Sequence, residues 1–251
     1  MCVTGRSEEL RLEGRKAVIF GGTSGIGMAT VNALLALGAQ VVAVSRSAQK
    51  YELSQFVHPC GTRGGLSLKS CDVLDRAALA ALFKEEAPFD ILVSAATGGS
   101  RALGPFLEMD IDGFKGSFDK FWGYANVVQL GAPHLSEKGA IVLVSGSPAR
   151  KPRAGQVALA AVGASVEQFA RSIARELAPK RINVVSPGVI ETPMFGADDE
   201  ARASKLGKMT ANNVIPRPGK PEEVAKGILF VIENEFVTGT TVDVDGGALL
   251  G

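Results

Sequence analysis

The stretch that decides the fold is residues 16–27, which read KAVIFGGTSGIG. Its first part, residues 16–20, is short, apolar and rich in β-formers, which is typical of a buried strand. Residues 26–37 carry apolar side chains at helical spacing and end at Gly38, a helix-stop signal. A glycine-rich turn between a strand and a helix is the context that a dinucleotide-binding motif requires. The run therefore predicts a nucleotide site at the end of this strand.

Each glycine of this turn has a physical task in that interpretation. Gly21 allows the sharp turn, Gly25 lets the backbone approach a pyrophosphate, and Gly27 permits close packing of the helix. The helix N-terminus then presents unpaired N–H groups and a positive dipole end to the phosphates. We expect the cofactor to contact the following residues of the turn: Gly21, Thr23, Ser24, Gly25, Ile26 and Gly27. The alternative is a glycine-rich turn without a ligand.

The rest of the chain continues the alternation of strand and helix. Apolar runs predict six further strands, at residues 41–44, 66–69, 90–93, 140–144, 182–185 and 240–244. Helical spacing predicts helices at residues 76–86, 114–130 and 158–177. Strands that are apolar throughout and separated by helices indicate a parallel sheet covered on both faces. The expected fold class is α/β, a Rossmann-type doubly wound parallel sheet of about seven strands with ligands at the carboxyl ends of the strands.

Length and composition exclude several classes of function. The 251 residues fit one domain, residues 1–251, and the net charge of +1 argues against nucleic-acid binding by bulk charge or a polybasic membrane anchor. No apolar stretch is uninterrupted enough to span a membrane. The three cysteines, Cys2, Cys60 and Cys71, have no metal-ligand spacing, and residues 1–10 do not resemble a secretory signal. We expect a cytoplasmic protein that takes a small-molecule substrate and no metal.

Two segments bear on the ligands. An acidic residue at the end of the second strand would bind ribose hydroxyls and repel a 2′-phosphate. That place holds Ser45 followed by Arg46, whose planar guanidinium suits phosphate oxygens, so the sequence favours NADP over NAD, the alternative being a solvated surface arginine. Residues 191–216 lack strong periodicity and contain Gly196, Gly207 and a charge cluster. A long loop of this kind is usually functional, and we expect a substrate lid.

These motifs resemble those of the short-chain dehydrogenase/reductase family over nearly the whole chain. Residues 71–73 (CDV) are similar to the family's adenine-contacting segment, and residues 94–96 (SAA) stand at its Asn-Asn-Ala-Gly turn. Residues 186–192 (SPGVIET) resemble the Pro-Gly segment that binds nicotinamide, and residues 217–223 and 242–247 match the C-terminal pattern. The resemblance implies a homodimer or homotetramer that binds NADP(H). It implies cofactor contacts from Asp72, Val73, Ser94, Ala95, Ala96, Pro187, Gly188, Ile190 and Thr192.

The catalytic end departs from the family pattern. The family's chemistry uses an Asn, a Ser, a Tyr and a Lys, the last two at i and i+4 of one helix. The resemblance places Leu159 and Gly163 at the Tyr and Lys positions, and neither side chain titrates. Gly146 stands at the Ser position and Lys120 at the Asn position. Hydride transfer to a carbonyl leaves an alkoxide that needs a proton or an oxyanion stabiliser, so the source of that proton is open.

A first hypothesis is an NADP(H)-dependent reductase with relocated catalytic groups. The candidates are Lys120, whose pKa partial burial would lower, and Ser147 or Ser145, which could donate to a developing oxyanion. The alternatives are a surface or ribose-contacting Lys120 that transfers no proton, and serines that cap the backbone after a strand. Tyr51 and Tyr124 are the only tyrosines, and neither fits the motif in any register.

Two further hypotheses stay open. In the second, the substrate needs no strong acid: an iminium becomes a neutral amine, and a conjugated enone spreads its charge. Such an enzyme keeps the proximity contribution but loses the roughly 10²–10⁴-fold that general acid catalysis supplies. In the third, the chain is a non-catalytic NADP(H)-binding or regulatory module, which binds NADPH without oxidising it. The basic residues Arg150, Lys151 and Arg153 are typical of a solvated loop, but near a pocket they would attract an acidic substrate.

Overall fold

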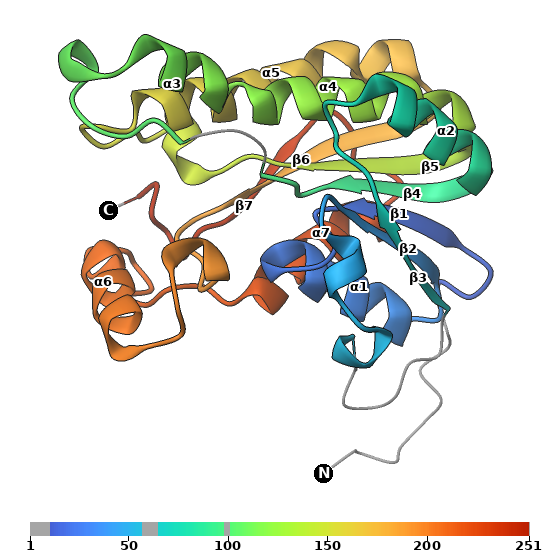
Figure 1. Cartoon of the computed structure of the whole chain (residues 1–251), viewed down its shortest axis with the longest axis horizontal. Coiled ribbons are helices and arrows are strands. Elements are labelled where there is room, and N and C mark those ends of the chain that lie inside the picture. Colours follow the sequence, from blue (N-terminus) through green and yellow to red (C-terminus); the bar gives the residue numbers. More distant parts are fainter. Residues whose placement is uncertain (1–10, 57–64, 98–100, 251) are drawn as a thin grey trace.

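A computed structural model describes residues 11–56, 65–97 and 101–250, so Cys2 and Cys60 lie outside the described ranges. Its centre is one sheet of seven parallel strands in the order β3-β2-β1-β4-β5-β6-β7 (Figure 1). The strands are β1 (Lys16–Phe20), β2 (Gln40–Ser45), β3 (Leu66–Ser70), β4 (Phe89–Ser94), β5 (Leu135–Val144), β6 (Arg181–Pro187) and β7 (Thr241–Val244). The doubly wound, seven-stranded α/β prediction is confirmed.

Helices cover both faces of this sheet. The helices are α1 (Gly25–Ala36), α2 (Arg76–Glu86), α3 (Ile111–Ser117), α4 (Asp119–Gly131), α5 (Val157–Leu177), α6 (Glu200–Thr210) and α7 (Pro221–Glu233). Short 3-10 turns stand at η1 (Ala48–Lys50), η2 (Leu53–Gln55), η3 (Phe106–Glu108), η4 (Ala132–His134), η5 (Ser147–Ala149) and η6 (Pro193–Phe195). Helices α2, α4 and α5 lie on one face and α1 and α7 on the other (Figure 1).

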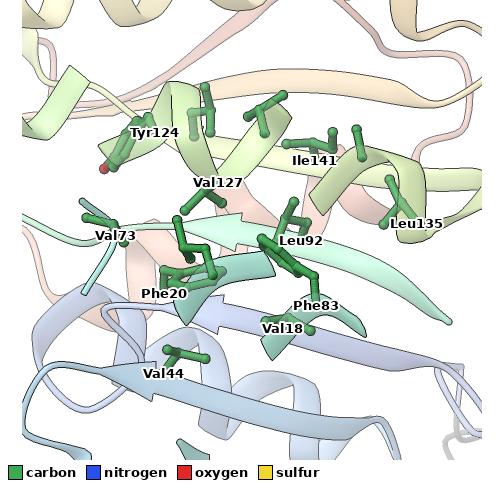
Figure 2. Packing of buried hydrophobic residues seen from close by; sticks show 14 of the residues in the cluster. Val18, Phe20, Val44, Val73, Phe83, Leu92, Tyr124, Val127, Leu135 and Ile141 are labelled. Carbon is green, nitrogen blue, oxygen red and sulfur yellow. The ribbon is translucent and has the colours of Figure 1, made fainter. Parts of the chain in front are cut away.

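The alternation of side chains along the strands builds two cores. On β1, Val18 and Phe20 face the core under α2, α4 and α5, whereas Ala17 and Ile19 face the core under α1 and α7. In the first core (Figure 2), Phe83 of α2 stacks between aromatic neighbours, with ring centroids 5.6 Å from Phe20 and 5.7 Å from Phe89. Both faces of the sheet are therefore covered by apolar cores, and a ligand can reach the sheet at the ends of the strands.

Two elements differ from the sequence prediction. The helix expected at residues 114–130 is two helices, α3 and α4, which meet at Phe118. The segment 191–216, expected to lack regular structure, contains α6. Asp199 caps α6 by accepting from the backbone N–H of Arg202 at 2.8 Å, and one face of the helix is buried at four-residue spacing. With three buried positions in an otherwise polar helix, of which Leu206 is the one apolar residue, the hydrophobic periodicity of α6 was too weak to predict a helix.

Among the described residues, no helix combines the length and the apolar character that a bilayer crossing would need.

Candidate cofactor crevice and active site

The glycine loop lies where the strand order reverses, between β1 and β4. The backbone N–H groups of Gly21 and Gly22 donate to the Val44 carbonyl at 2.8 and 3.2 Å, which ties the turn to the end of β2. Gly21 has φ of +78°, and a Cβ there would lie 2.7 Å from the Ala96 nitrogen. A Cβ on Gly27 would lie 2.0 Å from the Gly21 carbonyl oxygen. Glycine is therefore required at these two positions, and the loop is drawn tightly against the sheet.

The first turn of α1 is open to an anion. Its N-cap residue, Ser24, makes no side-chain capping hydrogen bond, and no acidic side chain stands in the first turn. A Cβ built on Gly25, whose φ is +50°, would lie 3.2 Å from the Thr192 side chain. The start of α1 therefore faces the segment after β6. Gly25 and Thr192, which come from distant parts of the chain and were both expected to bind the cofactor, lie close together. Backbone N–H groups and the helix dipole at such a start favour a phosphate.

Three serine hydroxyls at the carboxyl ends of strands are buried without a hydrogen-bond partner. They are Ser45 of β2, Ser94 of β4 and Ser186 of β6, and each Oγ is unpartnered among the described residues. Buried polar groups are nearly always hydrogen-bonded, so an unpartnered hydroxyl calls for a ligand or water. Ser45 and Ser94 were predicted to contact the cofactor; Ser186 was not, although its place just before Pro187 was a usable signal. The glycine cradle, the open helix start and these hydroxyls fit a dinucleotide.

The remaining predicted cofactor residues border the same edge of the sheet. Arg46 is exposed and makes no ion pair or hydrogen bond with another described residue. Asp72 accepts from the backbone N–H of Leu74 at 2.9 Å, and the carbonyl of Val73 accepts from Asn126 at 3.1 Å. The backbone N–H of Cys71 donates to the Ser45 carbonyl at 3.2 Å, so the turn after β3 lies beside the end of β2, which is where an adenine ribose would lie.

The loops after β4 and β6 are held by backbone hydrogen bonds. Ala95 donates to the Phe20 carbonyl at 2.9 Å, and Gly188 donates to the Val244 carbonyl at 3.1 Å. Ile190 is buried and pairs with Gly219 in an isolated bridge. Their main-chain groups are thus fixed in place at the positions expected to meet nicotinamide.

Lys120 projects from α4 toward the end of β5. Its Nζ donates to the Ser145 carbonyl at 3.3 Å and lies 5.5 Å from the centroid of the Tyr124 ring. The side chain is partly buried, and this burial, together with the positive charge of Arg101, lowers the pKa of the Lys120 ammonium to about 8. The structure therefore puts a group that titrates near neutral pH at the carboxyl edge of the sheet.

Neither tyrosine offers the chemistry that a catalytic tyrosine supplies. The Tyr124 ring is fully buried, its hydroxyl donates to the Val144 carbonyl at 3.2 Å, and burial raises its pKa. Tyr51 follows η1, on the face covered by α1. At the position that the resemblance assigns to lysine, a Cβ on Gly163 would lie 2.9 Å from the Ala149 Cβ. The 3-10 turn η5 thus packs directly onto α5 at this point.

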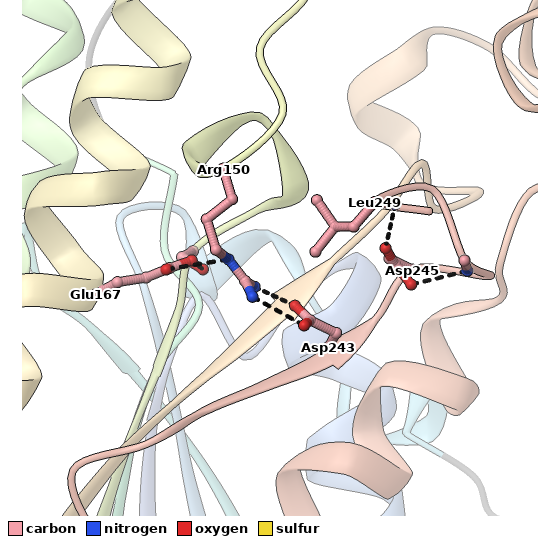
Figure 3. Close-up of polar contacts among 7 residues, drawn as sticks. Arg150, Glu167, Asp243, Asp245 and Leu249 are labelled. Atoms are coloured by element: carbon pink, nitrogen blue, oxygen red, sulfur yellow. Dashed lines mark hydrogen bonds and ion pairs between the residues drawn. The ribbon is translucent and has the colours of Figure 1, made fainter. Parts of the chain in front are cut away.

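Ser145 is tied into a charged network that the sequence did not predict. Figure 3 shows its charged members, Arg150, Glu167 and Asp243. Its hydroxyl donates to Glu167 Oε1 at 2.9 Å, and Glu167 Oε2 lies 3.3 Å from Arg150 Nε. The Arg150 guanidinium then forks onto Asp243 of β7, with one contact of 2.9 Å and a second, shorter one. Glu167 is buried on α5, one turn beyond Gly163. The network joins the ends of β5 and β7 to α5, and it occupies the Ser145 hydroxyl.

Ser147 lies differently, because it lines a cavity of about 290 Å³. The cavity is bounded by η5 and the loop after it, the segment after β6, the end of α6, and the C-terminal turn. Its lining residues are Ser147, Pro148, Lys151, Pro152, Arg153, Gln156, Val189, Lys208, Met209, Asn212, Asn213 and Ala248. Among the three candidate catalytic residues, Ser147 borders this space, whereas Lys120 and Ser145 meet at the end of β5. The described part of the chain holds no cluster of three metal-ligating side chains.

Comparison with known proteins gives consistent matches across the chain. Residues 21–248 match the family described as enoyl-(acyl carrier protein) reductase. Mouse L-xylulose reductase is 32% identical over 249 residues, covering 96% of this chain and 99% of its own length. The 3-oxoacyl-[acyl-carrier-protein] reductase of Thermotoga maritima is 34% identical over 254 residues, covering 96% and 100%. A short-chain dehydrogenase/reductase of Stachybotrys chlorohalonatus is 30% identical over 252 residues, covering 95% and 98%.

Solved structures agree with the sequence relatives. A small-chain dehydrogenase in complex with NADPH superposes with a TM-score of 0.77 at 29% identity, covering 94% of this chain and 99% of its own. The MalC reductase/Diels-Alderase of Malbranchea aurantiaca superposes with a TM-score of 0.85 at 26% identity, covering 96% and 97%. From the family match, the full-length relatives and the shared fold, it follows that this chain belongs to the short-chain dehydrogenase/reductase family of NAD(P)-dependent oxidoreductases.

Proposed function

We propose that this protein is an NADPH-dependent reductase of a small carbonyl, imine or enone substrate that works without a Tyr–Lys pair. The observation that carries the proposal is Lys120, whose ammonium, with a pKa of about 8, stands at the carboxyl end of β5. Leu159 and Gly163 supply no titratable group on the facing helix. A proton donor on α4 therefore takes over the task that the family assigns to α5.

The preference for NADPH rests on the end of β2. Arg46 is exposed there with no ion pair to a described residue, and no carboxylate follows the strand to repel a 2′-phosphate. The unpartnered hydroxyl of Ser45 adds a hydrogen-bonding group at the same place. The NADPH held by the related small-chain dehydrogenase is consistent with this choice.

The chemistry divides between cofactor and protein. When bound, NADPH would supply the hydride that reduces the electrophilic carbon. The Lys120 ammonium donates a proton to the resulting alkoxide, and the neutral amine regains its proton from solvent. Ser147, which lines the cavity, donates its hydroxyl hydrogen to the developing oxyanion. The Ser145 carbonyl accepts a hydrogen bond from Nζ of Lys120 and so positions it. The Ser145 hydroxyl takes no part in the reaction, because it donates to Glu167.

We also propose that residues 191–216 act as the lid of the substrate cavity. Lys208 and Met209 from the end of α6 and Asn212 from the turn after it line the cavity opposite Ser147 and Pro148. A segment that forms one wall of the pocket and carries few buried side chains can move away without disturbing the sheet. Limited proteolysis with and without NADPH tests this: protection of cleavage sites in 191–216 on ligand binding is expected, and unchanged cleavage contradicts the lid.

A homodimer or homotetramer is proposed on the exposed apolar side chains. Leu107 on η3 and Trp122 on α4 are 96% and 58% exposed, and Phe236 near β7 is 98% exposed. Exposed apolar patches commonly mark protein interfaces. Light scattering on the purified protein would report the mass in solution, and a monomer at micromolar concentration would contradict the proposal.

One observation favours the second candidate, a non-catalytic NADP(H)-binding module. The contact of η5 with Gly163, through Ala149, closes the place where a lysine side chain would begin. A chain freed from catalysis tolerates such packing, because nothing then requires the space to stay open. The two functions differ in one measurable respect, namely whether bound NADPH is oxidised.

Calorimetric titration with NADPH and separately with NADH tests the cofactor, followed by NADPH oxidation assays with an aromatic ketone, a cyclic imine and an enone. We expect preferential NADPH binding and oxidation with at least one of these electrophiles. Lys120→Met should lower ketone turnover roughly 10²-fold or more and imine turnover much less, because only the alkoxide needs the proton. Binding without oxidation supports the module, and no binding of either nucleotide overturns both functions.

A further inference from the structure

The cavity beside Ser147 gathers positive charge. Lys151 and Arg153 reach it from the loop after η5, and Lys208 reaches it from the last turn of α6. No aspartate or glutamate is among the described residues that line it. Three like charges around one small space create a positive potential that attracts an anion.

These cations have no carboxylate partner elsewhere. Among the described residues, Lys151 and Lys208 make no side-chain hydrogen bond or ion pair, and Arg153 makes one side-chain hydrogen bond, to the Met209 carbonyl at 3.0 Å. The neighbouring Arg150 shows the opposite arrangement, since its guanidinium is bound by both Glu167 and Asp243. The chain thus neutralises one cation of the 150–153 cluster and leaves the two that face the cavity available.

A second cavity, at the amino end of the sheet, provides a comparison. Arg11 and Arg15 line it, but Arg11 pairs with Glu233 at 3.1 Å and Arg15 with Asp90 at 3.3 Å. Two further cations, Lys138 and Arg181, line it as well, but so do three carboxylates, Asp90, Glu233 and Glu235, so its positive charges lie beside negative ones. The unpaired set occurs at the carboxyl edge of the sheet, where ligands bind in doubly wound folds.

We propose that the substrate carries an anionic oxygen group, a carboxylate or a phosphate ester, held by Lys151, Arg153 and Lys208. This deepens and rests on the proposed reductase function, because Ser147, the proposed oxyanion donor, lines the same cavity. A cavity of about 290 Å³ stands at the small end of ligand sites, which are usually about 300–1,000 Å³. A small organic acid fits these dimensions better than a long acyl chain.

Calorimetric titration of the NADP⁺-saturated protein at low ionic strength tests the proposal without requiring turnover. The probes are benzoylformate, its uncharged methyl ester, and inorganic phosphate. Lys151→Gln, Arg153→Gln and Lys208→Gln should each weaken benzoylformate binding about two- to five-fold, and the triple variant about tenfold or more. The matched control is Lys226→Gln, on an exposed position of α7 that lies outside the proposed lid and does not line the cavity. It should leave binding unchanged.

The probes separate the possible outcomes. The acid should bind more tightly than its ester, and added salt should weaken the acid alone. Tighter binding of phosphate than of benzoylformate, lost in the same three variants, identifies a phosphate ester as the anionic group. Equal binding of acid and ester, or an equal loss in Lys226→Gln, overturns the proposal. Failure of the reductase function would appear separately, as benzoylformate bound normally beside NADPH that is never oxidised.

Discussion

Removal of Glu167 should destabilise the protein far more than removal of an exposed acid from the same helix. Glu167 is 7% exposed, and it accepts a hydrogen bond from the buried Ser145 hydroxyl at 2.9 Å. It also lies 3.3 Å from Arg150 Nε, which extends the contact to Asp243 and β7 (Figure 3). Asp245 closes the C-terminal turn nearby by accepting from the backbone N–H groups of residues 247 and 249.

The magnitude follows from the two partners. Hydrogen bonds to charged groups contribute about 1.5–3 kcal/mol, and Ser145 would be left buried without its acceptor. Arg150 keeps its ion pair with Asp243 and is partly exposed. Loss of the Glu167–Arg150 ion pair therefore lowers the free energy of unfolding by only about 0.5 kcal/mol or less. We expect Glu167→Ala to lower the free energy of unfolding by about 2–3 kcal/mol, and Glu167→Gln by about 1 kcal/mol, since its amide oxygen can still accept from Ser145.

Thermal and urea unfolding measure these changes, and for a chain of this length about 2–4 °C in Tm corresponds to each kcal/mol. Glu176→Ala, exposed near the end of α5, is the matched control and should leave Tm almost unchanged. A double-mutant cycle with Ser145→Ala should give a coupling of about 1–2 kcal/mol. Additive losses, or a Glu167→Ala variant as stable as the Glu176→Ala control, would refute the network as a source of stability.

Three other perturbations test separate parts of the site. Arg46→Ala should weaken NADPH about ten- to a hundredfold by calorimetry and leave NADH unchanged; equal losses would place the 2′-phosphate elsewhere. If Lys120 donates the proton, kcat/KM for ketone reduction should fall tenfold per pH unit above about 8, and Lys120→Met should be flat. Because the folded pKa of Lys120 lies below its ordinary 10.5, the free energy of unfolding should also rise between pH 8 and 10.5, and Lys120→Met should abolish that rise in urea titrations. Gly163→Ala should lower the free energy of unfolding, measured in urea, by about 1–3 kcal/mol, because its new methyl group would contact Ala149. Adding Ala149→Gly should restore most of this stability; no recovery would show that the strain lies elsewhere.

The fold was predictable because its signals are local. Each apolar run produced a strand of the sheet, and the glycine run marked the turn after β1, since both patterns depend on neighbours in the sequence. Strand β5 begins at Leu135, five residues before its apolar run, because Leu135 pairs with Phe89 across an irregular register. That pairing is a tertiary contact, and no periodicity within residues 135–139 could have predicted it.

The glycine turn was easier to predict than the surroundings of Lys120 for the same reason. Gly21 and Gly25 stand in one motif, whereas the contact of Lys120 with the Ser145 carbonyl joins two elements 25 residues apart. The burial of Glu167 was not predicted, because a glutamate in a helix is usually solvated. Its burial results from tertiary contacts with Ser145, after β5, and with Arg150, which is bound to β7. Its spacing of four residues from Gly163 was a usable signal, since it puts both on one face of α5.

One face of α5 carries three of the residues discussed above. Leu159, Gly163 and Glu167 follow one another at four-residue spacing; Gly163 allows close packing against Ala149, and Glu167 pairs with Arg150. Gly163 lets η5 approach through Ala149, and that approach places Arg150 where Glu167 can bind it. A lysine at Gly163 would push η5 outward and separate this pair, so the contact between Arg150 and Glu167 depends on the small residue at that position. In the proposed reductase, the proton donor is on α4, where Lys120 stands.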